Sequence, residues 1–150
     1  MNVHEQLMAD LKAALREQDR VRKSAIRMAI AALKNARVEK NADLTEDEMI
    51  ATLAKEVKQR RNAMAEFERA GRKDLVASES AELTILEAYL PEALSEEELV
   101  ELARQVIAET GADNPKRMGQ VMSALMPRVR GRADGRQVSQ IVRELLTSAG

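Results

Sequence analysis

The sequence has no cysteine and no tryptophan, and it contains a single histidine, a single phenylalanine and a single tyrosine. The absence of cysteine excludes disulfides, thiolate nucleophiles and cysteine-based metal sites. His4 is interpreted as an incidental surface residue, because it lies near a chain end, where chains commonly fray. No phosphate loop of the form GxxxxGK followed by Ser or Thr occurs, nor any cluster with metal-ligand spacing. The sequence therefore predicts no catalytic residue, no metal and no cofactor.

Long apolar runs are also missing. Charged residues interrupt every window long enough to span a bilayer, and the N-terminal stretch MNVHEQLMADLKAAL lacks the unbroken apolar segment of a signal peptide. We therefore predict a cytoplasmic protein with no membrane partner. Phe67 and Tyr89 both stand at spacings that point inward, so they cannot form a platform on which unpaired bases stack. Any nucleic-acid partner is expected to be a structured RNA such as tRNA, contacted through its backbone, and no DNA partner is expected.

The residues that are abundant favour helices. Hydrophobic residues make up 45% of the chain, and with so few aromatics the core must consist of Ala, Leu, Ile, Val and Met. Ala, Leu, Met, Glu, Lys and Arg are strong helix formers, and β-branched residues nowhere alternate with polar ones over a useful length. The predicted fold is all-α. An N-terminal helical bundle of about four helices occupies residues 1–90, and a smaller three-helix tail bundle occupies residues 95–150.

Local signals give the approximate helix boundaries. Apolar spacing predicts a first helix whose inward face contains Leu7, Leu11, Ala14 and Leu15, and further helices over 21–36, 46–70 and 75–89. Capping-box patterns begin helices at Thr45-x-x-Glu48 and Ser95-x-x-Glu98, and Asn114-Pro115 is a further start signal. Gly71 and Gly111 are placed as helix stops, and Asp134 as the cap of the last helix.

Charge is divided sharply along the chain, although 24 Lys+Arg nearly balance 25 Asp+Glu. Residues 1–40 hold nine bases and five acids, a net charge of +4. Residues 79–109 hold nine acids and one base, whereas residues 115–150 hold seven bases and two acids, a net charge of +5. Such asymmetry indicates that charge determines which partners bind the chain. The acidic run is interpreted as a solvated face, with a docking surface for a basic partner as the alternative.

The basic end contains a candidate phosphate-binding loop. Arg128, Arg130 and Arg132 alternate through a short connection, and Gly131 and Gly135 would permit unusual backbone dihedrals there. The planar fork of arginine can bind phosphate bidentately, but a solvated surface is the alternative. A second basic group lies on one side of the second predicted helix and is interpreted as a solvated face, with a partner contact as the alternative. This group comprises Arg16, Arg20, Lys23, Arg27 and Lys34.

Several motifs together resemble the YqeY family over nearly the whole chain. The N-terminal ones are Leu33-Lys34-Asn35, Lys58-Gln59-Arg60, Phe67 with Gly71-Arg72-x-Asp74-Leu75, and Tyr89-Leu90-Pro91. The most specific is the C-terminal array, in which Met118-Gly119-x-Val121-Met122 precedes Met126-Pro127-x-Val129-x-Gly131-x-Ala133-Asp134-Gly135. Proteins of this family resemble the C-terminal helical and tail region of GatB, the B subunit of the tRNA-dependent amidotransferase, whose tail helps to hold the tRNA body.

The resemblance implies roles for individual residues. Gly119 would lie within the sixth helix and allow a neighbouring helix to approach closely, while Gly131, Asp134 and Gly135 would shape the turn. The basic side chains would face the RNA, namely Lys116, Arg117, Arg128, Arg130, Arg132 and Arg136.

The resulting hypothesis is a non-catalytic module associated with tRNA or tRNA-dependent amidation. The catalytic domain of GatB has no counterpart in this chain, so no activity is expected from the chain alone. The family label would be a carbon–nitrogen ligase with glutamine as amido-N-donor. Two alternatives remain. One is an accessory subunit of an amidotransferase or aminoacyl-tRNA synthetase, docked through the acidic run. The other is a protein-interaction bundle unrelated to RNA.

Overall fold

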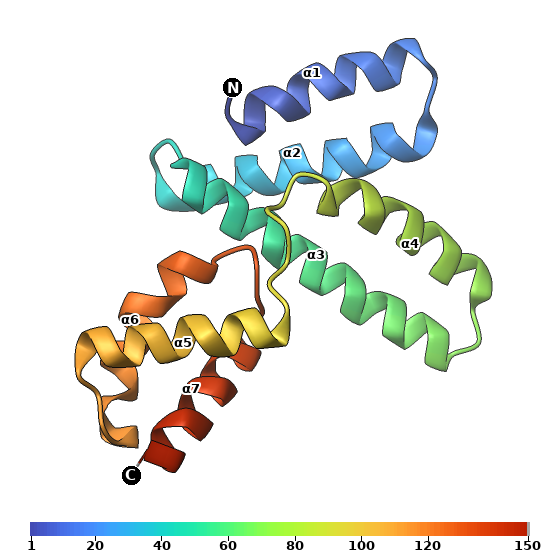
Figure 1. Cartoon of the computed structure of the whole chain (residues 1–150). Coiled ribbons are helices and arrows are strands. Elements are labelled where there is room, and N and C mark those ends of the chain that lie inside the picture. Colours follow the sequence, from blue (N-terminus) through green and yellow to red (C-terminus); the bar gives the residue numbers. More distant parts are fainter. Residues whose placement is uncertain (150) are drawn as a thin grey trace. The chain divides into compact units, whose positions relative to one another are not determined.

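The structure is a computed structural model that describes residues 1–149, and within them it contains seven α-helices, one short 3₁₀ helix and no strand (Figure 1). The prediction of an all-α protein is confirmed. The chain divides into two compact units, Met1–Leu90 and Pro91–Gly150. Each unit has its own hydrophobic cluster, so each is described by itself.

The N-terminal unit consists of four helices. Helix α1 packs along α2, α3 packs along α4, and α2 also contacts both α3 and α4. The bounds of these helices are α1 (Val3–Arg16), α2 (Arg20–Lys40), α3 (Glu46–Arg69) and α4 (Lys73–Glu87).

Capping interactions place the helix ends of this unit. The Thr45 hydroxyl accepts from the Glu48 N–H at 3.1 Å, and the Glu48 carboxylate accepts from the Thr45 N–H at 2.9 Å, which confirms the predicted capping box. Asn41 ends α2 in the left-handed conformation with a φ of 59°, and Gly71 follows α3 with a φ of 72°. Asn tolerates this conformation better than most residues, and glycine does so without steric cost.

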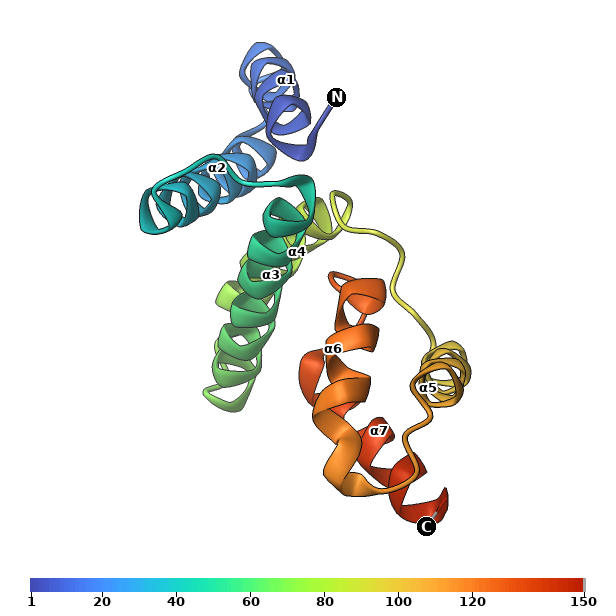
Figure 2. The same ribbon diagram turned by 90° about the vertical axis from the view of Figure 1, so that its left-hand side faces the viewer.

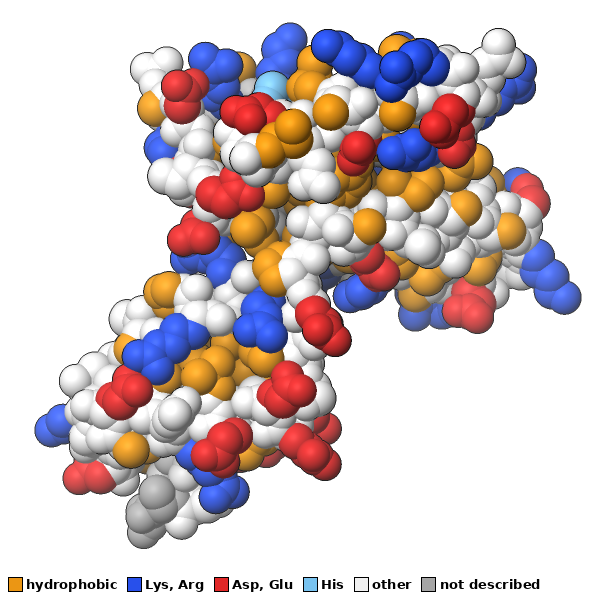
Figure 3. All heavy atoms as spheres, turned by 45° about the horizontal axis from the view of Figure 1, so that its top comes forward, with side chains coloured by type: hydrophobic (Ala, Val, Ile, Leu, Met, Phe, Trp, Pro, Cys, Tyr) orange, Lys and Arg blue, Asp and Glu red, His pale blue; other side chains and the backbone are white. Residues whose placement is uncertain are grey.

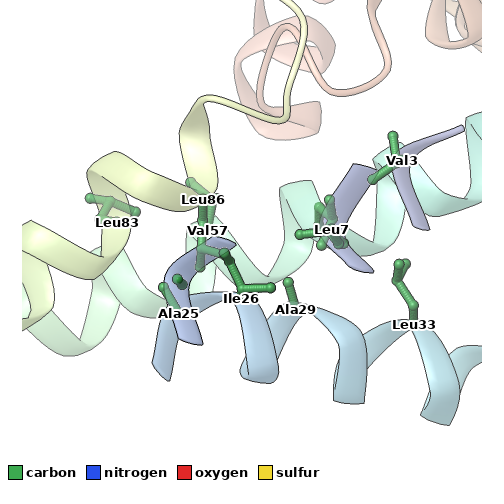
Figure 4. Packing of buried hydrophobic residues seen from close by; sticks show 11 residues of the cluster. Val3, Leu7, Ala25, Ile26, Ala29, Leu33, Val57, Leu83 and Leu86 are labelled. Carbon is green, nitrogen blue, oxygen red and sulfur yellow. The ribbon is translucent and has the colours of Figure 1, made fainter. Parts of the chain in front are cut away.

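The core of this unit is entirely aliphatic, as the composition predicted (Figure 4). Leu7, Ile26, Leu53 and Leu86 are almost completely buried, and Tyr89 is partly buried against the same cluster. Leu15 was expected on the inward face of α1 but is 47% exposed. The neighbouring Ala14, also expected on that face, is fully buried, and the two residues lie about 100° apart around a helix that is covered on one side.

The C-terminal unit consists of three α-helices and one 3₁₀ turn, and the three helices pack against one another around a second cluster (Figure 2). Their bounds are α5 (Glu96–Thr110), η1 (Pro115–Arg117), α6 (Met118–Val129) and α7 (Gly135–Ala149). The Asn114-Pro115 signal begins the 3₁₀ turn rather than α6 itself, and the Asn114 side chain caps that turn by accepting from the Lys116 N–H at 2.9 Å. Gly111 ends α5 with a φ of 69°, as predicted.

Candidate nucleic-acid interface

The six basic residues predicted to face RNA fall into two groups at opposite ends of α6 (Figure 2). Lys116 and Arg117 belong to η1, just before α6 begins. The other four, Arg128, Arg130, Arg132 and Arg136, lie near the end of α6, in the connection to α7 and in the first turn of α7. The two groups are separated by the length of α6, about 16 Å at 1.5 Å per residue. The structure does not gather them into one cluster.

Hydrogen bonds hold the connection between α6 and α7 in a defined shape. Gly131 has a φ of 76°, a left-handed conformation that favours glycine. The N–H of Arg132 then donates to the carbonyl of Val129 at 2.8 Å, and the carbonyl of Arg132 accepts from the N–H of Leu94 at 2.9 Å. Asp134 begins α7, where its carboxylate accepts from the Arg136 N–H at 3.1 Å. The turn is therefore fixed by main-chain contacts and by the Asp134 carboxylate.

Two of the six basic side chains form ion pairs. Arg128 binds Glu109 of α5 with both ends of its guanidinium, at 2.6 and 3.3 Å. This hydrogen-bonded pair lowers the pKa of the Glu109 carboxyl and raises the pKa of Arg128. Arg117 lies 3.9 Å from Asp113, an exposed contact of the kind that contributes little. No sequence pattern predicted the Arg128–Glu109 pair, because its members are 19 residues apart on different helices.

The remaining four basic side chains have no carboxylate partner among the described residues. Lys116, Arg130 and Arg136 are exposed, whereas Arg132 is partly exposed and its Nε donates to the carbonyl of Glu92 at 2.9 Å. Arg130 and Arg136 stand on either side of the turn at Gly131, and neither forms an ion pair with an acid among the described residues.

Two expectations about glycine are wrong. A Cβ added at Gly119 would meet no atom within 4 Å, so no helix approaches closely at this exposed second residue of α6. Gly135 has no positive φ, and a Cβ there would meet only Met126 Cε at 3.9 Å, an ordinary contact. Of the two glycines expected to permit unusual dihedrals in the loop, only Gly131 adopts one.

The acidic run from Glu79 to Glu109 is shared between the two units, because the division between them falls after Leu90. In the N-terminal unit, Glu79 and Glu82 bind Arg60 at 3.1 and 2.8 Å. Glu87 pairs with Arg61. These α4 carboxylates join α4 to α3, a role that the sequence did not indicate. In the C-terminal unit, Glu96, Glu97 and Glu98 occupy the first turn of α5, where acids complement the helix dipole.

The described residues contain no group of three or more His, Cys, Asp or Glu side chains arranged to hold a metal ion. None of the helices in the described part of the chain combines the length and apolar character needed to cross a membrane.

Curated relatives of the chain are proteins named "Altered inheritance of mitochondria protein 41, mitochondrial". The one from Pyrenophora tritici-repentis is 32% identical over 144 residues, which cover 93% of this chain and 78% of that protein. The one from Kluyveromyces lactis is 40% identical over 95 residues, covering 61% of this chain and 51% of that protein. The one from Lachancea thermotolerans is 31% identical, covering 73% and 60%. The matched segment thus spans about half to three quarters of these relatives.

The prediction of a cytoplasmic protein is contradicted by these relatives, whose names place them in mitochondria. That prediction rested on the absence of an apolar leader in the N-terminal stretch, and such an absence is a weak guide to compartment.

The family comparison covers almost the entire chain. A sequence model of the family described as "Yqey-like protein" matches residues 4–146, which include the predicted C-terminal motif array and every helix except the last few residues of α7 and the first residue of α1. The chain therefore belongs to the YqeY family.

Proposed function

We propose that this chain is a non-catalytic module that binds the backbone of a folded RNA, with tRNA as the candidate. In this proposal the four N-terminal helices form a supporting bundle and α5, α6 and α7 form the tail that contacts the RNA. The observation that carries the proposal is the pair Arg130 and Arg136, which flank the hydrogen-bonded turn at Gly131 without a carboxylate partner in the described chain. Lys116 adds an unpaired charge at the other end of α6.

Phosphate is the chemistry that this arrangement suits. Guanidinium groups bind phosphate oxygens through paired, charge-assisted hydrogen bonds, and a turn with a fixed backbone reduces the entropy lost when such contacts form. Base stacking is not available, because Phe67 and Tyr89 are both partly buried in the N-terminal unit. We therefore expect recognition of shape and backbone without sequence preference.

The test is the salt dependence of tRNA binding, measured by filter retention at several salt concentrations. Each phosphate contact contributes about −0.9 to the slope of log K against log salt for a duplex. Replacing Arg130 and Arg136 with Gln should therefore make the slope shallower by about 2. The matched control replaces Arg117 and Arg128, which lie beside Asp113 and Glu109, and should change the slope less.

Two results would count against this proposal. If the wild-type chain binds tRNA no better than it binds a neutral polymer, the chain is not an RNA-binding module. If the two double variants change the slope equally, the unpaired residues at the Gly131 turn are not the contact.

A further inference from the structure

Helix α2 carries a row of basic side chains that the proposed site does not use. Arg20, Lys23, Arg27 and Lys34 fall within about 60° of one another around the helix axis. We call these four residues the α2 stripe. Arg20, Arg27 and Lys34 are exposed and Lys23 is partly exposed. No member of the α2 stripe forms an ion pair with any acid among the described residues.

The other basic residues of α2 behave differently. Arg22 lies 3.3 Å from Glu17 and 3.7 Å from Asp10, Arg37 binds Asp43 at 3.0 Å, and Lys40 binds Glu48 at 2.6 Å. These three residues lie on a different side of the helix, about 70 to 130° from the centre of the stripe. The single acid within α2, Glu39, is about 130° away from that centre. No acid within α2 lies on the side of the α2 stripe, and Asp19, the N-cap residue of the helix, borders the stripe at its N-terminal end. The paired cations, by contrast, each contact an acid.

The stripe points away from the core of its unit. Ala25, Ile26, Ala29 and Leu33 are buried on the opposite side of α2, against the aliphatic cluster. Figure 3 shows Lys and Arg side chains along the upper edge of the N-terminal unit, where α1 and α2 lie. From Arg20 to Lys34 the row extends about 21 Å, because 14 residues rise 1.5 Å each. Its N-terminal end borders a hollow of about 250 Å³ at the α1–α2 turn, which is lined by Ala14, Leu15, Gln18, Asp19, Arg20 and Lys23.

We propose that the α2 stripe is a second contact for the phosphate backbone of the folded RNA that the C-terminal unit binds, so this inference rests on the proposed function. Phosphate charges in a helical nucleic acid lie only a few ångströms apart, so a straight row of this length faces several of them. Because the four cations form no ion pair with any of the residues that the structure describes, binding phosphate would break none of the ion pairs described.

Other occupants fit the stripe less well. Protein interfaces are depleted of charge, and of Lys in particular, at their centres, whereas the α2 stripe consists of four cations. The apolar residues at its edges are Ala31 and Ile30, and Ile30 packs against the core of the unit. Helices that lie on membranes insert a broad apolar face, but the apolar face of α2 is buried in the core of the unit. A second copy of the chain that binds through the same stripe would place like charges opposite each other. The row therefore favours a polyanion with regularly spaced charges.

The test compares two triple variants of the full chain. The stripe variant is Arg20→Gln, Arg27→Gln and Lys34→Gln. The control variant is Arg37→Gln, Arg61→Gln and Arg69→Gln, which removes the same charge from ion-paired, exposed positions of the same unit. Circular dichroism first establishes that both variants keep wild-type helicity. For tRNA, the slope of log K against log salt should become shallower by about 2.7 in the stripe variant and by less than about 1 in the control.

The outcomes separate this inference from the proposed function. If the stripe variant keeps the wild-type slope while the Arg130 and Arg136 variant loses affinity, the α2 stripe is not a contact and the C-terminal site stands. If the stripe contributes equally to binding of polyglutamate matched in charge, or to binding of anionic phosphatidylserine vesicles but not to tRNA, the assignment to RNA is overturned. A shallower tRNA slope in the stripe variant alone supports it.

Discussion

The ion network at Arg60 allows a sharp prediction about stability. Arg60 of α3 is 12% exposed in its side chain and binds Glu79 and Glu82 of α4, whose side chains are 24% and 14% exposed. Ser24 of α2 donates to Glu82 at 3.1 Å, so the network joins three helices. Arg60 also contacts the sulfur of Met28, and its Nε is buried without a partner in the described chain.

Arg60→Met would keep the apolar stem while leaving two carboxylates with little access to water and no cation. Removing one member of a buried pair costs about 3–5 kcal/mol. Because the two glutamates keep some exposure, the expected loss in free energy of unfolding is about 3 kcal/mol. Glu79→Gln should cost only about 1 kcal/mol, because Arg60 keeps its contact with Glu82 at 2.8 Å. The exposed pair between Arg61 and Glu87 supplies the surface control, Arg61→Gln, with a loss under about 1 kcal/mol.

Urea unfolding followed by tyrosine fluorescence measures the loss in free energy of unfolding of the N-terminal unit. Tyr89 is the only tyrosine, tryptophan is absent, and Tyr89 packs against the N-terminal cluster, so the signal reports that cluster alone. The triple variant Arg60→Met, Glu79→Gln and Glu82→Gln should recover much of the stability, since no uncompensated charge remains. The reasoning is refuted if Arg60→Met destabilises the unit no more than Arg61→Gln does.

Three further predictions concern single contacts. Thr45→Ala should lower the free energy of unfolding of the N-terminal unit by about 1 kcal/mol in urea titrations, because it removes half of the capping box; an unchanged midpoint would contradict this. The hydrogen bond from Lys40, together with those from Thr45, lowers the pKa of Glu48 from its ordinary 4.5 to about 2, so the stabilising effect is present above pH 4.5 and is lost as the pH falls toward 2. Carboxyl carbon NMR should show this titration, and Lys40→Ala should move it toward 4.5. Burial, together with the hydrogen bond to Asp10, raises the pKa of Tyr89, so ultraviolet titration should show ionisation well above pH 10, and Asp10→Asn should lower that pKa.

Local signals in the sequence predicted much of the fold. Helix boundaries followed from side chains that act on their own neighbourhood, such as Thr45 with Glu48 and the stop at Gly111. The absence of strands followed from composition. Leu15 was misplaced because apolar periodicity defines a face only to within about one residue, and packing decides which side chain it buries.

The arrangement of charge was much harder to predict. Arg60 and Glu82 are 22 residues apart, and Arg128 and Glu109 are 19 apart, so no spacing rule within one helix relates them. The sequence alone therefore does not distinguish arginines that form ion pairs from those that do not. Gly119 shows the same limit, because the residue type gives no indication that the space beside it is open.

The two hydrophobic clusters draw on separate stretches of chain: residues buried in the first come from Val3 to Leu86, and those of the second from Leu99 to Leu146. No side chain is shared between them. A peptide-bond cleavage after Leu90 would consequently leave all the buried residues of each cluster on one fragment.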